Sequence, residues 1–208
     1  MLHFMKRLAI LLVVAGCAGA PRPVPMVGGI IDSFEDGDEL NALAHSWEAV
    51  GTGEGARASF TIDPGGFDSG SKYHLSVQGV RPEVPSGNEV AGIRTSITQL
   101  PPIADPSREE RPRDLTGFSG LALAIRGTPG TYIVQIGTTS VEDFDYFNAY
   151  VEVTPGWSEF KLPFSSFRQE GFGVPRPWTG TDVSHVAVYA NLPGYFEYGI
   201  DDVRFHSP

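Results

Sequence analysis

The sequence is poor in cysteine, in positive charge and in long apolar segments, and each shortage excludes a class of protein. Cys17 is the only cysteine among 208 residues, so the chain beyond it has no internal disulfide. Lys and Arg total 15 against 25 Asp and Glu, which gives a formal net charge of −10. An acidic chain without a basic patch is poorly suited to the phosphate backbone, so we expect no nucleic-acid partner.

Glycine and proline, by contrast, are plentiful, at 25 and 17 residues. They separate short apolar segments, and beyond the N-terminal region no apolar stripe repeats at helical spacing. About ten short segments alternate apolar and polar side chains, with turn signals every 8 to 12 residues. This pattern predicts an all-β fold, a two-sheet antiparallel β-sandwich formed by residues 30–206.

The N-terminus has the composition of an export signal. Lys6 and Arg7 precede a short apolar run, too short to cross a bilayer, that ends at Cys17. The four residues that end in Cys17 resemble the bacterial lipobox, in which the cysteine is lipidated and becomes the mature N-terminus. Residues 1–16 would then be a lipoprotein signal peptide and residues 17–29 a Pro/Gly-rich tether. Ala18 after the cysteine resembles an outer-membrane address. The alternative is an ordinary signal peptide with a chance cysteine.

The most informative stretch is residues 143–167, which opens with strict alternation. Phe147, Ala149, Val151 and Val153 form an apolar face, and we expect them to point into the core. The opposite face carries two tyrosines, an amide and a carboxylate: Tyr146, Asn148, Tyr150 and Glu152.

Other segments add planar polar and aromatic side chains to the face opposite the core. If the later strands share one sheet, a shallow groove results, with Ala122 and Ala124 in its floor. Tyrosine rings stack on the C–H faces of sugars, and the polar groups bond hydroxyls. The alternative is that these side chains only stabilise an exposed sheet. The candidate ligand-binding residues are Arg94, Gln135, Tyr146, Asn148, Tyr150, His185 and Tyr189.

Two further expectations concern loops. Trp178, in a proline-rich loop, either caps the groove as an eighth ligand-binding residue or anchors its loop to the core. The turn at residues 128–130 predicts a hairpin in which residues 121–126 pair with residues 132–138.

Catalytic patterns are absent from the sequence. Asp143 and Asp145 are two residues apart on one predicted strand, so they cannot flank a glycosidic bond, and we interpret them as a solvated strand end. No Gly-x-Ser-x-Gly motif occurs, and the histidines lack metal-ligand spacing. The sequence therefore predicts a protein without enzymatic activity.

Five short segments resemble the galactose-binding-like jelly rolls: residues 32–36, 73–77, 114–121, 157–164 and 199–203. Within that group the sequence is most similar to two families. One is the β-glucan-binding family-eleven carbohydrate-binding modules, and the other is the complex I intermediate-associated assembly-factor family. The resemblance covers nearly all of residues 30–206 and implies a jelly roll that holds its ligand on one concave face.

The same resemblance implies a structural calcium ion, since many such sugar-binding modules hold one between the first and last strands. Asp32, Glu35 and Asp201 match the acidic positions, and carboxylate oxygens suit Ca²⁺. The alternative is that Glu35 and Asp201 merely end strands at the surface.

Two functions are therefore expected. The first is a membrane-anchored module that binds a polysaccharide or glycoconjugate and is held to the bacterial envelope by a lipid on Cys17. The second is an assembly factor whose tyrosine-bearing face meets a protein partner.

Overall fold

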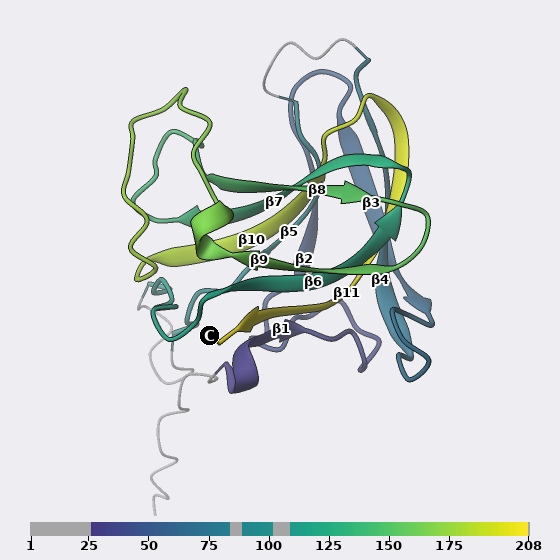
Figure 1. Ribbon diagram of the computed structural model, residues 1–208, viewed down its shortest axis with the longest axis horizontal. Helices are drawn as coiled ribbons and strands as arrows, with labels where there is room; N and C mark the ends of the chain where they lie inside the picture. The colour runs from purple at the N-terminus through teal and green to yellow at the C-terminus, as the bar shows by residue number, and fades with distance from the viewer. Residues whose placement is uncertain (1–25, 84–88, 102–108, 208) are drawn as a thin grey trace, which may run out of the picture.

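The computed structural model describes residues 26–83, 89–101 and 109–207 (Figure 1). The signal peptide, Cys17 and most of the tether lie outside the described residues. Within those residues, no helix has the length and hydrophobicity needed to span a bilayer. Two short 3-10 helices, η1 (Val27–Gly29) and η2 (Phe164–Ser166), accompany eleven strands. The strands are β1 (Ile30–Asp32), β2 (Trp47–Gly51), β3 (Arg57–Pro64), β4 (Tyr73–Arg81), β5 (Ala91–Ser96), β6 (Gly120–Gly127), β7 (Gly130–Thr138), β8 (Phe147–Val153), β9 (Ser158–Pro163), β10 (Val183–Ala190) and β11 (Gly194–His206).

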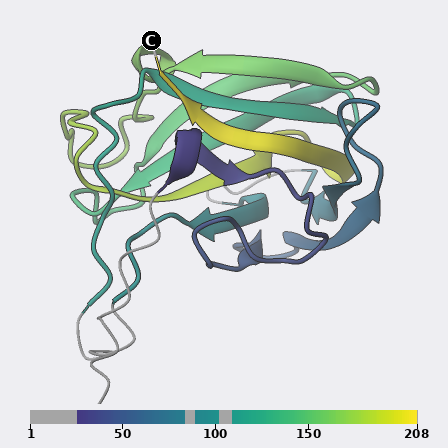
Figure 2. The same ribbon diagram turned by 90° about the horizontal axis from the view of Figure 1, so that it is seen from below.

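The strands form two antiparallel sheets, which confirms the predicted all-β sandwich. A five-stranded sheet has the order β2-β5-β10-β7-β8. A six-stranded sheet has the order β3-β4-β11-β6-β9, with β1 also paired to β11. Figure 2 shows β1 in purple beside the yellow β11. Strand β11 has a bulge near Asp201, because its register shifts between Asp201 and Arg204 and Asp202 has a φ of 53°.

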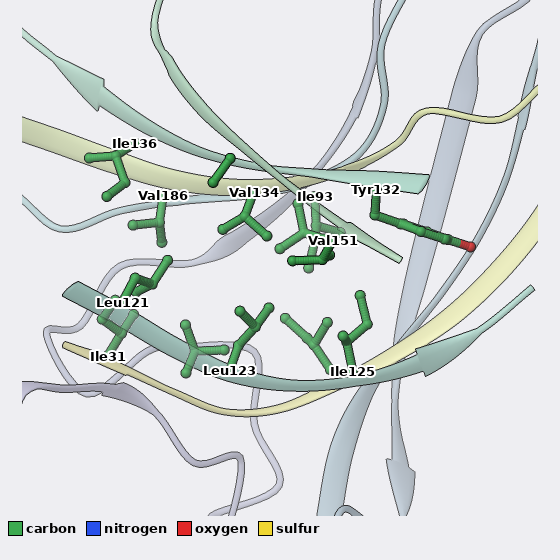
Figure 3. Close-up of a cluster of buried hydrophobic side chains, with 14 of the residues drawn as sticks. Ile31, Ile93, Leu121, Leu123, Ile125, Tyr132, Val134, Ile136, Val151 and Val186 are labelled. Carbon is green, nitrogen blue, oxygen red and sulfur yellow. The ribbon is translucent and has the colours of Figure 1, made fainter. Parts of the chain in front are cut away.

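The core lies between the sheets and follows from the period of two along each strand. In Figure 3, side chains of β5, β7, β8 and β10 point toward those of β1 and β6. Leu121, Leu123 and Ile125 of β6 are at most 1% exposed, as are Ile93 and Val134 of the opposite sheet. Burying each such side chain contributes about 1.5–3 kcal/mol, so the alternation alone fixes which face of each strand turns inward.

The predicted hairpin between residues 121–126 and 132–138 is wrong. Strand β6 pairs with β9 and β11, whereas β7 pairs with β8 and β10 in the other sheet. The turn at residues 128–130 therefore carries the chain from one sheet to the other. It runs beside the β8–β9 connection, since the Gly127 amide donates to the Thr154 carbonyl at 2.9 Å. A short turn with Pro and Gly looks the same in sequence whether it closes a hairpin or a crossover.

One consequence of this crossover concerns the predicted groove floor. Ala122 and Ala124 lie on β6, in the six-stranded sheet, so they are not the floor of a groove on the five-stranded sheet. Ala187 of β10 and Gly137 of β7 occupy that place instead.

Candidate functional site

One row of polar side chains crosses the five-stranded sheet on the face away from the core. In antiparallel strands, directly paired residues point to the same side. The register pairs Glu48 with Arg94, Arg94 with Ala187, Ala187 with Gln135, and Gln135 with Asn148. Residues far apart in the sequence thus form a continuous row, with the small Ala187 at its centre.

Two neighbouring rows add the aromatic side chains. Tyr189 is paired with Ile133, which is paired with Tyr150, and His185 is paired with Gly137. Tyr146 immediately precedes β8 and contacts His185 with its ring. The register thus places all seven residues predicted from the strands on one surface, called the tyrosine face below: Arg94, Gln135, Tyr146, Asn148, Tyr150, His185 and Tyr189.

His185 lies flat across the sheet because its neighbour has no side chain. A Cβ on Gly137 would come within 1.8 Å of the imidazole, so the ring occupies that space. The imidazole and the Tyr146 ring are 4.8 Å apart between centroids and lie at 90° to each other. Burial, followed by the positive charge of Arg94, lowers the pKa of His185 to about 4. The imidazole is therefore neutral at physiological pH.

The tyrosines differ in how their hydroxyls are used. Within the part of the chain that the structure describes, the hydroxyls of Tyr146 and Tyr189 have no hydrogen-bond partner. Burial raises the pKa of Tyr189 to about 12, so its phenol stays protonated. Tyr189 is only 5% exposed, so the hydroxyl of the half-buried Tyr146 is the more accessible of the two for the hydroxyls of a ligand.

A hollow of about 380 Å³ opens beside these residues toward β2 and β5. Arg94 and His185 line it together with Glu48, which accepts a hydrogen bond from the guanidinium of Arg94 at 2.8 Å. This bond raises the pKa of Arg94. Glu48 did not stand out in the sequence, and only the pairing of β2 with β5 brings it to the tyrosine face.

Glu170 is a second residue that sequence reasoning missed. Its carboxylate accepts hydrogen bonds from the Asn148 amide at 3.1 Å and from the Tyr150 hydroxyl. Gln135 in turn donates to Asn148 at 3.0 Å. Burial and the bond to Glu170 raise the pKa of Tyr150 to about 12. Glu170 comes from the loop between η2 and β10, which Figure 1 shows as a tall loop at the left of the view.

Asp145 fixes that loop, and the expectation that it belongs to a solvated strand end is wrong. It is 1% exposed and accepts three backbone N–H groups, from Glu170 at 2.8 Å and from Gly171 and Gly173 at 3.0 Å. Asp143 accepts the Val174 amide, and this bond lowers the pKa of its carboxyl. Both carboxylates are committed to backbone groups, so they position the loop.

Trp178 is the one predicted ligand-binding residue that lies away from the tyrosine face. Its ring packs against Phe164 at 4.9 Å and against Phe147 at 5.2 Å between centroids. Phe147 points into the core. Trp178 therefore anchors its loop to the core, which was the other of the two alternatives.

Comparisons with known proteins agree with the predicted resemblance. Residues 90–187 match the family model of complex I intermediate-associated protein 30. That span runs from β5 into β10, so it contains most of the five-stranded sheet.

Two solved structures of a family 11 carbohydrate-binding module from Clostridium thermocellum are similar in fold. One belongs to a cellulosomal cellulase and has a TM-score of 0.60 at 15% identity, covering 86% of this chain and 94% of the module. The other, in complex with a β-1,3-1,4-mixed-linked tetrasaccharide, has a TM-score of 0.59 at 17% identity, covering 86% and 95%. The predicted jelly-roll architecture is thereby confirmed.

A curated relative is Endoglucanase 3 of Fibrobacter succinogenes, which is 26% identical over 180 residues. The match covers 80% of this chain but only 25% of the endoglucanase. The chain thus corresponds to about a quarter of that enzyme.

The three predicted calcium ligands are not grouped around one point. Among the described residues, no set of three His, Cys, Asp or Glu side chains is placed to hold a metal ion. Asp32 accepts the Trp47 indole N–H at 2.7 Å, and Glu35 accepts the Lys72 amide at 3.0 Å. Asp201 accepts the amide of residue 67 at 2.8 Å. Calcium binding is untested, and it would require these carboxylates to rearrange from the positions that they occupy here.

Proposed function

We propose that this protein is a non-catalytic carbohydrate-binding module that holds a polysaccharide or glycoconjugate on the tyrosine face. The observation that supports this most directly is the set of side chains in register across the five-stranded sheet. Planar polar groups alternate there with aromatic rings, and two tyrosine hydroxyls are unpaired within the described chain. Such a surface matches the alternating C–H and hydroxyl faces of a sugar chain.

The comparisons support the same proposal. Solved structures of similar fold are carbohydrate-binding modules, one of them with a mixed-linked tetrasaccharide. The carboxylates of Asp143, Asp145 and Glu170 are engaged in hydrogen bonds that hold the loop and the face together. This arrangement favours binding over hydrolysis, because none of the three is left to act as an acid or a nucleophile.

Affinity electrophoresis against a panel of soluble polysaccharides, including β-1,3-1,4-mixed-linked glucan, tests the proposal. We expect at least one glycan to retard the wild-type protein. Tyr146→Ala and Tyr150→Ala should each weaken that retardation about tenfold, since a lost aromatic contact costs about 0.5–1.5 kcal/mol beyond its buried area. If no glycan retards the wild-type protein, the proposal is wrong.

A protein-binding role is the second candidate, and the match of residues 90–187 to the complex I intermediate-associated family favours it. In that case the tyrosine face would meet a partner protein. Tyr146→Ala and Tyr150→Ala would then weaken a protein complex, measured by co-purification from an envelope extract, without any glycan being bound.

The proposed location is the bacterial envelope, probed through Cys17. A lipid on this cysteine would hold the module on the membrane. Ala18, the residue after it, favours the outer membrane. Cys17→Ser should move the protein from the membrane fraction to the soluble fraction, whereas an ordinary signal peptide would leave its distribution unchanged.

A further inference from the structure

An exposed phenylalanine with a strained backbone lies next to the tyrosine face. Phe144 has a φ of 66°, in the left-handed region, and is 75% exposed. Three other described non-glycine residues share positive φ: Phe34, Ala44 and Asp202. Of these four, only Phe144 places a large apolar side chain in solvent, because Phe34 is fully buried. Such strain costs about 1–3 kcal/mol, and the exposed ring has little packing to offset it.

The backbone around Phe144 is held from both sides. Its neighbours Asp143 and Asp145 accept amide groups of the loop formed by residues 170–174. That loop also presents apolar side chains to solvent, with Phe172 68% exposed and Val174 58% exposed. The two segments are fixed through backbone groups, so their apolar side chains need no partner within the fold.

Aromatic contacts connect Phe144 to the tyrosine face. Its ring meets Tyr146 at 6.4 Å between centroids and at 89°, and Tyr146 meets His185 at 4.8 Å. The apolar surface at Phe144 is therefore continuous with the polar face and extends it beyond the start of β8.

We propose that Phe144 is a ligand-contacting residue that stacks on one further sugar ring of a glycan chain bound to the tyrosine face. This inference rests on the proposed function and assigns it an additional subsite. A pyranose ring offers an apolar C–H face of the size of a phenyl ring, and the chain it belongs to already lies on the adjoining surface. An anionic lipid surface is a poorer match, because two acidic residues, Glu142 and Asp143, directly precede Phe144.

Isothermal titration with di-, tetra- and hexasaccharides of β-1,3-1,4-mixed-linked glucan tests this subsite. The wild-type protein should bind more tightly as the chain lengthens. Phe144→Gly should bind the disaccharide like the wild type but lose about three- to tenfold in affinity for the hexasaccharide. Glycine adopts positive φ without strain, so the unfolding midpoint of this variant should stay equal or rise. A structural role for Phe144 would lower the midpoint instead.

Tyr195→Ala is the matched control, because Tyr195 is 57% exposed and its strand, β11, belongs to the six-stranded sheet. It should leave the dependence on chain length unchanged. If the wild type binds the oligosaccharides and Phe144→Gly binds them equally, the subsite is refuted while the proposed function stands. A lower midpoint with unaltered affinities would also refute it. If the wild type binds none of them, the proposed function fails for this glucan and the subsite fails with it.

Discussion

One cluster of aromatic side chains on the outer face of the six-stranded sheet packs together, whereas the tyrosine face has two hydroxyls without a partner among the described residues. Trp157 meets His74 at 5.4 Å and Phe67 at 6.4 Å between ring centroids. The guanidinium carbon of Arg126 lies 4.9 Å from the centre of the same indole. These contacts cover the Trp157 ring with groups of the protein itself.

Charged side chains are paired on both faces, and on the tyrosine face Arg94 pairs with Glu48 at 2.8 Å. On the six-stranded sheet, Arg204 pairs with Glu159 at 2.5 Å and with Asp202 at 3.3 Å, and Lys161 approaches Glu159 at 3.5 Å. The larger hollow, about 530 Å³, also lies there, beside Arg126. The hollow at the tyrosine face is smaller, but His185, which lines it, contacts Tyr146, whose hydroxyl has no partner among the described residues. Size and available chemistry thus favour different faces, and we give priority to chemistry, since binding specificity comes from convergent polar groups.

The largest expected effect separates stability from binding. Trp157→Ala should lower the free energy of unfolding by about 3 kcal/mol, because it removes the centre of an aromatic cluster, yet leave retardation by glycan unchanged. Tyr150→Ala should leave the free energy of unfolding nearly unchanged, since Tyr150 is 49% exposed, and should weaken the retardation by glycan. Denaturant titration and affinity electrophoresis on both variants give the comparison. Loss of retardation in a folded Trp157→Ala protein would move the binding site to the six-stranded sheet.

Much of this contrast was accessible from the sequence, because alternation along a strand reports which side chains share a face. The alternation around Tyr146 and Tyr150 predicted that both point away from the core. A shift of the register by one residue would have buried them in place of Val151. Partners across long sequence separations were not accessible. Glu170 reaches Tyr150 only because Asp145 bends its loop back, and a buried aspartate looks like any exposed one in a sequence. The sequence of the turn at residues 128–130 likewise did not show to which sheet β6 belongs.

The next effect concerns pH, through two buried groups with opposite shifts. Asp32 lies on β1, and burial raises its pKa from 3.8 to about 7. A raised carboxyl pKa stabilises the fold at low pH, and that contribution is lost as pH rises toward 7. His185 is lowered from 6.5 to about 4, beside Arg94 and Tyr146. Its contribution is present above pH 6.5 and is lost as pH falls toward 4.

The two contributions oppose each other between about pH 4 and 6.5. A variant that removes one of the two groups should therefore show the pH dependence that the other group causes. In Asp32→Asn, the free energy of unfolding should rise with pH relative to wild type. In His185→Gln it should fall, by on the order of 3 kcal/mol across the range at about 1.4 kcal/mol per pKa unit. Comparison with wild type removes the titration of the remaining carboxylates. Profiles that stay parallel to wild type in both variants would contradict the shifts.

The smallest expected effect concerns calcium. A site filled at a hundredfold excess over its dissociation constant would stabilise the fold by about 2.7 kcal/mol, which a thermal scan readily detects. Because Asp32, Glu35 and Asp201 are each engaged by protein N–H groups, we expect the same unfolding midpoint in calcium and in chelator. A midpoint that falls in chelator, and no longer does so in Asp201→Asn, would instead show that the ends of β1 and β11 rearrange to take up the ion. In that case the six-stranded sheet would be stabilised by a ligand of its own, while the tyrosine face kept its unpaired groups for a glycan.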